Sequence, residues 1–267
     1  MDTTQIRKLI TEHFRSTLKT FHRDGFVVGL SGGIDSTLTA HLAVEAVGPA
    51  RVLGVIMPER ESSPESKELG VAVAEQLGIR HEEVDLTSHL EAVGAYEKRD
   101  AIVRKYFESY RPDRHRVGIA LHQDLTGSSM PPLNYLVVQN EEGEQICEER
   151  IRLNDYMQLV AATNFKQRAR ALQVYYFADY YNYAVAGTTN RDELLLGFFV
   201  KLGDGAADVE GIEGMYKSEL YVLAKAMGVD QRVIDRTPTT DTLPAQKSQK
   251  GYFWARLRDA GYGASGI

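Results

Sequence analysis

The chain has 267 residues, of which 43% are hydrophobic, so it is long enough to bury one sizeable core. Its 31 Lys and Arg against 37 Asp and Glu leave a net charge of −6, which argues against nonspecific binding to nucleic acid. The single Cys147 excludes an internal disulfide, a zinc cluster or an iron–sulfur cluster, and no signal peptide or run of ~18 apolar residues is recognisable, so we expect a cytoplasmic protein without a membrane partner.

The first ninety residues alternate between helical and strand patterns. Apolar residues recur at helical spacing between Ile6 and Leu18, and a short buried strand follows at 26–30. After a glycine-rich turn we expect, in order, a helix at 36–47, a strand at 51–57, a helix at 66–77 and a strand at 79–84. This alternation predicts an α/β fold, with a doubly wound, mostly parallel Rossmann-like sheet that carries helices on both faces.

Periodicity breaks down from about Gly94 to Ile151, and we interpret this stretch as an insertion within a single domain that spans 1–267. It could hold a hairpin, because 133–138 and 144–151 flank a plausible turn at 140–143. Beyond the insertion, the patterns predict a long helix at 153–181, a buried strand at 183–187, a helix at 217–227 and an irregular segment at 238–250.

The turn between the first strand and the next helix carries the clearest chemical signal, in the string Ser31-Gly32-Gly33-Ile34-Asp35-Ser36. Such a turn presents backbone N–H groups and the positive end of a helix dipole to an anion. Gly32 and Gly33 allow close backbone approach, Ser31 and Ser36 add hydroxyl donors, and Asp35 adds a carboxylate that can bind Mg²⁺. Two glycines alone would equally fit a tight connection in which Asp35 caps the helix.

The complete Ser-Gly-Gly-Xaa-Asp-Ser string resembles the pyrophosphate loop of the N-type ATP pyrophosphatases, enzymes with the adenine nucleotide alpha hydrolase-like fold. Further blocks resemble those of the ammonia-dependent NAD synthetases within that group. They are the Asn-x-Lys-x-Arg-x-Arg stretch at 164–170, the Gly-Thr segment at 187–193, the Gly-Phe-x-x-Lys-x-Gly-Asp-Gly block at 197–205, Lys217, and Pro238-Thr239.

The resemblance implies ATP as a co-substrate and Mg²⁺ bound by Asp35 and Glu193, with Lys217 and Thr239 on phosphate oxygens. Thr188 would join the serines and glycines of the loop around ATP, and Arg60 is a candidate for the adenine or ribose side. The acyl substrate would be bound by Asn164, Arg168, Lys201 and Asp204, and the residues expected to act in catalysis are Asp35, Lys201, Asp204 and Lys217.

The implied reaction has two steps: a carboxylate, that of nicotinic acid adenine dinucleotide, attacks the α-phosphate of ATP, and ammonia then displaces AMP to form the amide. No glutamine-hydrolysing domain fits in the chain, so we expect free ammonia as the nitrogen source unless a separate partner supplies it. A homodimer is the family expectation. The tyrosines at 175, 176, 180, 181 and 183 are better explained by core and interface packing than by base stacking.

The substrate side departs from the family pattern, because Gln246-Lys247 stands where an Asp-Glu pair is usual. Two alternatives therefore stay open. One is a related ligase that acts on a different carboxylate, and the other is a nucleotide-binding module without turnover. The stretch 164–170, taken without the resemblance, would be a solvated helix face.

Overall fold

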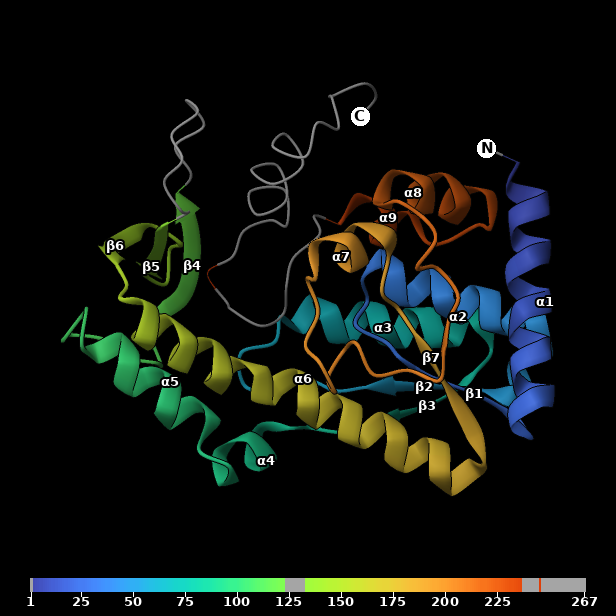
Figure 1. Cartoon of the computed structure of the whole chain (residues 1–267), viewed down its shortest axis with the longest axis horizontal. Helices are drawn as coiled ribbons and strands as arrows, with labels where there is room; N and C mark the ends of the chain where they lie inside the picture. The colour runs from blue at the N-terminus through green and yellow to red at the C-terminus, as the bar shows by residue number, and fades with distance from the viewer. Residues whose placement is uncertain (1, 123–132, 237–244, 246–267) are drawn as a thin grey trace. The chain divides into compact units, whose positions relative to one another are not determined.

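A computed structural model describes residues 2–122, 133–236 and 245 of this chain (Figure 1). The fold divides into two compact units. The first is formed by Met1–Thr87 and Gln167–Arg236, and the second contains Ser88–Lys166, which includes the predicted insertion at 94–151. Within the residues described, no helix is both long enough and apolar enough to cross a membrane.

The first unit is built on a five-stranded sheet in which every neighbouring pair of strands is parallel. The strand order across the sheet is β3 (Arg80–Glu83), β2 (Val52–Ile56), β1 (Gly25–Gly29), β7 (Tyr183–Gly187) and β8 (Val209–Glu210). The chain first adds β2 and β3 on one side of β1, and it later adds β7 and β8 on the other side of β1. The order of the strands therefore reverses between β1 and β7, and ligands of open α/β sheets bind at the carboxyl ends of strands beside such a reversal.

Helices cover both faces of this sheet because alternate residues of each strand point to opposite sides. Phe26 and Val28 belong to a buried cluster with α1 (Thr3–Phe21), α2 (Ile34–Val47), α3 (Pro64–Leu77) and α8 (Lys217–Ala226). Val27 packs on the other face, in a smaller cluster with Val174 and Ala178 of α6 (Leu153–Tyr181). The expected doubly wound α/β fold is thereby confirmed.

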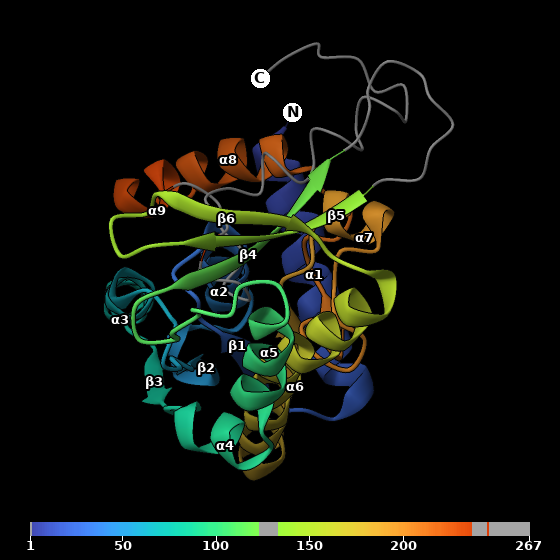
Figure 2. The same ribbon diagram turned by 90° about the vertical axis from the view of Figure 1, so that its left-hand side faces the viewer.

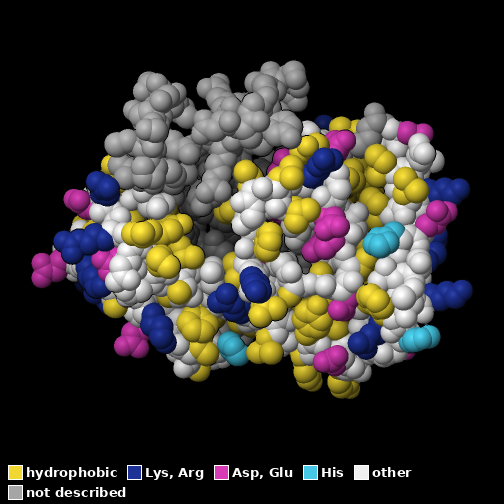
Figure 3. Space-filling model, viewed as in Figure 1, with side chains coloured by type: hydrophobic (Ala, Val, Ile, Leu, Met, Phe, Trp, Pro, Cys, Tyr) yellow, Lys and Arg dark blue, Asp and Glu magenta, His cyan; other side chains and the backbone are white. Residues whose placement is uncertain are grey.

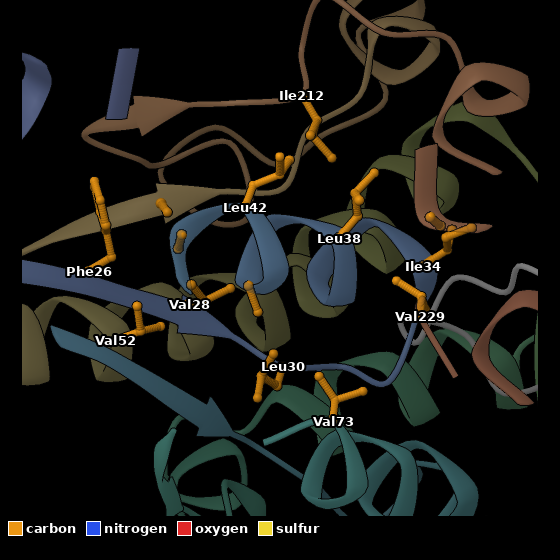
Figure 4. Close-up of a cluster of buried hydrophobic side chains, with 14 of the residues drawn as sticks. Phe26, Val28, Leu30, Ile34, Leu38, Leu42, Val52, Val73, Ile212 and Val229 are labelled. Carbon is orange, nitrogen blue, oxygen red and sulfur yellow. The ribbon is translucent and has the colours of Figure 1, made fainter. Parts of the chain in front are cut away.

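The core of the larger face is centred on α2. Figure 4 shows Leu38 and Leu42 pointing from α2 toward Ile212, while Val28 of β1 lies beside the helix. These side chains are completely shielded from solvent. Burial of apolar surface at roughly 25 cal/mol per Å² makes this contact a main source of the stability that holds the loop between β1 and α2.

The second unit contains α4 (Thr87–Ala92), α5 (Ala95–Arg104) and an antiparallel sheet of β4 (Arg116–His122), β5 (Leu133–Gln139) and β6 (Gln145–Arg150), seen in Figure 2. The predicted hairpin is confirmed as β5 and β6. Its turn is closed by a hydrogen bond of 3.0 Å from the Asn140 N–H to the Glu144 carbonyl oxygen. Its core joins α5, the sheet and the first part of α6 through Val103, Val117, Leu136, Val138 and Leu159.

Besides the hairpin, the insertion contains α5 and β4, which the sequence patterns did not predict. The buried face of α5 includes the ion pair of Arg99 and Asp100, whose side chains are 1% and 7% exposed. Two charged residues on the core side remove the apolar stripe by which a helix is usually identified. In β4, Val117 and Ile119 alternate with Gly118 and Ala120, and these two small residues make the pattern weak.

Most element predictions in the first unit are confirmed with small shifts at the ends. The helix expected at 217–227 is α8, and the long helix expected at 153–181 is α6. The short elements α7 (Arg191–Leu196), β8 and α9 (Gln231–Asp235) were not predicted. Of the segment expected to be irregular, 238–250, all but Ala245 lies outside the described residues.

Candidate active site

The loop between β1 and α2 has a backbone that only glycine adopts without strain at its centre. Gly32 has a φ of 69°, and a Cβ there would lie 2.7 Å from the Ser66 carbonyl oxygen and 2.8 Å from the Leu69 Cβ. The loop therefore packs directly on α3. The Ser31 and Ser36 hydroxyls lie 3.1 Å apart, and Ser36 donates to the Gly33 carbonyl oxygen at 3.1 Å, so hydroxyl groups of the motif hold the turn closed.

The amino-terminal end of α2 is not capped by a side chain. Gly33 occupies the N-cap position, and Asp35 is the second residue of the helix with its carboxylate turned to other partners. This arrangement counts against the simpler interpretation in which Asp35 caps the helix. The first backbone N–H groups of α2 and the helix dipole are thus available to an anion at the carboxyl end of β1.

Asp35 makes contacts with two side chains that are distant in sequence. Lys217 Nζ, at the start of α8, forms an ion pair with Asp35 Oδ2, and Asn190 Nδ2 donates to Asp35 Oδ1 at 3.0 Å. Burial by itself would lower the pKa of Lys217, but the carboxylates of Asp35 and Glu193 outweigh it and raise that pKa. Lys217 is therefore a stable cation beside the loop.

Glu193 is the second carboxylate of this group. Asn190 and Glu193 form a capping box at the start of α7: the Glu193 N–H donates to Asn190 Oδ1 at 3.0 Å, and the Asn190 N–H donates to Glu193 Oε2 at 3.1 Å. Burial, followed by the negative charge of Asp35, raises the pKa of Glu193 to about 8, against the opposing effect of Lys217. A buried carboxyl group whose pKa is raised in part by a neighbouring carboxylate marks a place where a cation would be stabilised.

Other residues that the sequence singled out lie around the same edge. Thr188 directly follows β7, and Arg60 follows β2, where its guanidinium lies 3.6 Å from the Glu61 carboxylate. Thr239 lies outside the described residues. The carboxyl ends of β1, β2 and β7 thus bring the loop, Arg60 and Thr188 to one edge of one sheet.

The residues expected on the acyl-substrate side are only partly brought together. Arg168 Nε donates to the Lys201 carbonyl oxygen at 3.3 Å. Asp204 accepts from the Val200 N–H at 2.6 Å, so its carboxylate closes the turn that carries Lys201. Asn164 belongs to the second unit, whereas Arg168, Lys201 and Asp204 belong to the first.

Sequence reasoning missed two residues that contact this site. Asn190 lies within the Gly-Thr segment, where the spacing Asn190-x-x-Glu193 is that of a capping box and could have indicated its bond to Glu193, but nothing nearby in the chain indicates its bond to Asp35. Arg236 donates to the Ser31 carbonyl oxygen at 3.2 Å and to the Ser66 hydroxyl at 2.6 Å, so it ties the loop to α3. Both contacts join segments that are more than 150 residues apart in the chain, which periodicity does not reveal.

Comparison with known proteins identifies the family. The family model for NAD synthase matches residues 6–122 and 131–252. The NH3-dependent NAD+ synthetase of Mesorhizobium japonicum is 42% identical over 94% of this chain and 78% of that protein, and that of Methanocaldococcus jannaschii is 32% identical over 92% of this chain and 74% of that protein.

Solved structures agree on the fold. NMN synthetase from Francisella tularensis superposes with a TM-score of 0.70 at 22% identity, covering 100% of this chain and 89% of that one. The NH3-dependent NAD synthetase of Campylobacter jejuni superposes with a TM-score of 0.63 at 22% identity, covering 98% and 85%. The chain belongs to the NAD synthase family, whose members are AMP-forming ligases that use ATP, as the motifs of the sequence indicated.

Proposed function

We propose that this protein adenylates the carboxylate of nicotinic acid adenine dinucleotide with ATP and amidates it with ammonia, releasing AMP and pyrophosphate. The observation that carries the proposal is the group of Asp35, Glu193 and Lys217 beside an uncapped helix terminus and a glycine loop. A helix terminus that can bind an anion, a lysine cation and a pair of carboxylates at one place suit a nucleoside triphosphate that loses pyrophosphate. The names of relatives at 42% identity support the dinucleotide as the acyl substrate.

The phosphates are the part of ATP that this site is best suited to hold. The backbone N–H groups at the start of α2 and the hydroxyls of Ser31 and Ser36 can donate to phosphate oxygens. Lys217 is paired with Asp35 and stays charged, so it can neutralise the negative charge that develops on the departing pyrophosphate. In this proposal Thr188 and Thr239 add hydroxyl donors, and Arg60 binds the adenosine part.

Asp35 and Glu193 are the residues that would hold Mg²⁺. The negative charge of Asp35 beside the buried Glu193 carboxyl group fits a cation between them, and Mg²⁺ takes one or two carboxylates from a protein together with water and phosphate oxygens. When bound, Mg²⁺ supplies positive charge that neutralises phosphate oxygens. Within the described residues no group of three or more His, Cys, Asp or Glu side chains could hold a metal ion, so a two-carboxylate site completed by ATP is the form we propose.

Within the first unit, the acyl substrate would be bound by Arg168 and Lys201, whereas Asn164 of the second unit stays a prediction of the resemblance alone. The bond from Arg168 to the Lys201 carbonyl and the turn closed by Asp204 support a joint role, because together they fix the backbone that carries the Lys201 side chain. Positioning of this kind lowers the barrier to carboxylate attack by removing motional freedom before reaction.

The remaining parts of the proposal concern assembly and location. We propose a single synthetase domain with an insertion, in the cytoplasm, that works as a homodimer and takes free ammonia. An exposed apolar row on α6 supports the dimer: Leu172, Tyr176 and Tyr180 are 56%, 57% and 67% exposed and recur every fourth residue. On the face seen in Figure 3, basic and acidic side chains are interspersed, which suits small-molecule substrates better than a polyanion.

A pyrophosphate-release assay tests the function. The purified chain is incubated with ATP, Mg²⁺ and ammonium, with nicotinic acid adenine dinucleotide, with nicotinic acid mononucleotide, or with no carboxylate. We expect release only with the dinucleotide, and loss of release in the Asp35→Asn variant. Release with the mononucleotide alone would refute the substrate and leave the ligase class intact. ATP binding without release under any condition would favour the nucleotide-binding module.

A further inference from the structure

The Glu210 carboxylate, at the end of β8, lies where the side chain of any residue other than glycine at position 187 of the neighbouring strand β7 would collide with it. A Cβ built on Gly187, the last residue of β7, would lie 2.2 Å from Glu210 Oε1 and 2.4 Å from Oε2. Gly187 and Glu210 are also direct partners in the parallel register of β7 and β8. The missing side chain at Gly187 is what allows the Glu210 carboxylate to lie across the carboxyl end of β7.

From that position Glu210 holds the turn that follows β7. The Thr189 N–H donates to Glu210 Oε2 at 3.3 Å. Thr189 is only 8% exposed, so its N–H group would lose a partner without access to water if the carboxylate were removed. Burial raises the pKa of Glu210 to about 7. An uncharged carboxyl group still offers a carbonyl oxygen to Thr189, so the contact does not depend on the charge.

The turn that Glu210 holds is the one that carries Asn190. Asn190 is 1% exposed, and its side-chain amide has both ends occupied: Nδ2 donates to Asp35, and Oδ1 accepts from the Glu193 N–H, each at 3.0 Å. A displaced Thr189 would therefore shift the side chain that sets the spacing of both carboxylates.

We propose that Glu210 is a positioning residue of the ATP site, which fixes the turn at Thr189 and Asn190 and thereby holds Asp35 and Glu193 in one arrangement for Mg²⁺ and phosphate. This inference rests on the roles assigned to Asp35 and Glu193 in the proposed function. Glu210 acts through Asn190: it accepts from the Thr189 N–H, and the neighbouring Asn190 donates to Asp35.

Asp208 provides a matched control on the same segment. Its Oδ2 accepts from the Val185 N–H at 2.8 Å, so it too binds a backbone group of β7 through a carboxylate. This bond lies in the middle of β7, and Asp208 Oδ1 accepts from the Tyr175 hydroxyl of α6 at 3.4 Å, so both of these partners lie away from the turn at Thr189 and Asn190. Loss of Asp208 should weaken the sheet without moving Asn190.

The test compares Glu210→Ala, Glu210→Gln and Asp208→Ala with the wild type in calorimetric titrations of ATP at a series of Mg²⁺ concentrations, with thermal unfolding measured alongside. Binding is used as the readout because it does not depend on the identity of the carboxylate substrate. For Glu210→Ala we expect about tenfold weaker Mg²⁺-dependent ATP binding and a higher half-saturating Mg²⁺ concentration, since one buried hydrogen-bonded constraint is lost. Glu210→Gln should stay within about threefold of the wild type, because its amide oxygen still accepts from Thr189.

Asp208→Ala should lower the unfolding temperature and leave ATP affinity unchanged. Wild-type affinity in Glu210→Ala, or equal loss of affinity in Asp208→Ala, would overturn the inference while leaving the proposed function in place. Absence of Mg²⁺-dependent ATP binding by the wild type would overturn both. A wild type that binds ATP but does not turn over the dinucleotide would refute only the substrate.

Discussion

Lys217 Nζ is paired with the Asp35 carboxylate although 182 residues separate them in the chain. The pair joins the first turn of α8 to the first turn of α2, two helices that pack on the same face of the sheet. Both side chains are mostly shielded, at 20% and 19% exposure, so the charge of each is compensated chiefly by the other. This contact places a cation at the loop that is expected to bind pyrophosphate.

Replacement of Lys217 by Met should impair both stability and reaction. The loss of the cation leaves Asp35 and Glu193 facing each other uncompensated, which costs roughly 3–5 kcal/mol when one partner of a buried pair is removed. Pyrophosphate release should fall by about 10²–10³-fold, as when a charge-stabilising donor is removed from an active site. Lys225→Met, on an exposed position of the same helix, is the control and should change neither the unfolding temperature nor the rate.

Gly32→Ala should disrupt the loop itself. A positive φ costs an alanine roughly 1–2 kcal/mol, and the new methyl group would also have to displace the Ser66 carbonyl or Leu69. We expect a lower unfolding temperature together with strongly weakened ATP binding. Gly78→Ala separates the two effects, because Gly78, at the end of α3, has a similar positive φ of 63° but open space around it. If both variants bind ATP equally, the close packing of the loop on α3 is not required.

Arg236 is expected to keep the loop in its binding conformation. Its guanidinium bonds the Ser31 carbonyl and the Ser66 hydroxyl, so Arg236→Gln should release the loop from α3. The expected result in steady-state kinetics is a KM for ATP raised about tenfold, with a smaller change in kcat, because ground-state binding is what the contact supports. Arg232→Gln, an exposed arginine on α9 paired with Asp230, should behave as the wild type. An unchanged KM for ATP in Arg236→Gln would mean that the contact only anchors α9.

His41 should make the fold sensitive to mild acid. Burial in α2 lowers the pKa of His41, with Glu45 partly opposing this effect. Because the folded pKa lies below the unfolded one, the folded state is favoured with His41 neutral, and its stability falls as pH drops below the unfolded pKa of about 6.5. Thermal unfolding between pH 7.5 and pH 5 checks this.

The variant His41→Met should lose part of the decline of unfolding temperature with falling pH, whereas His13→Met, at an exposed site on α1, should retain it. Among the described residues, His41 Nε2 has no hydrogen-bond partner, so its removal breaks no contact of that atom. An identical pH profile for His41→Met and the wild type would contradict the assignment.

Local sequence was sufficient for the regular parts of the first unit. The strands β1, β2 and β7 are short, continuous apolar runs, and glycines lie within two residues of the carboxyl ends of the helices α2, α3 and α8. The pattern failed at α5, where the ion pair of Arg99 and Asp100 lies on the core side. It also failed at β8, where two residues are too few to show alternation.

The sequence by itself determined that a loop with glycines at its bend lies between a buried strand and a helix. The apolar run of the strand and the preference of glycine for a positive φ, as at Gly32, are both properties of a few neighbouring residues. The distant motifs added Glu193 and Lys217 by resemblance. Only the tertiary structure decided that Asn190 bonds both Asp35 and Glu193, that Arg236 holds Ser31, and that Gly187 leaves room for Glu210. These contacts join strands and helices far apart in the chain, and their geometry depends on how the sheet pairs and packs, which no short stretch of residues encodes.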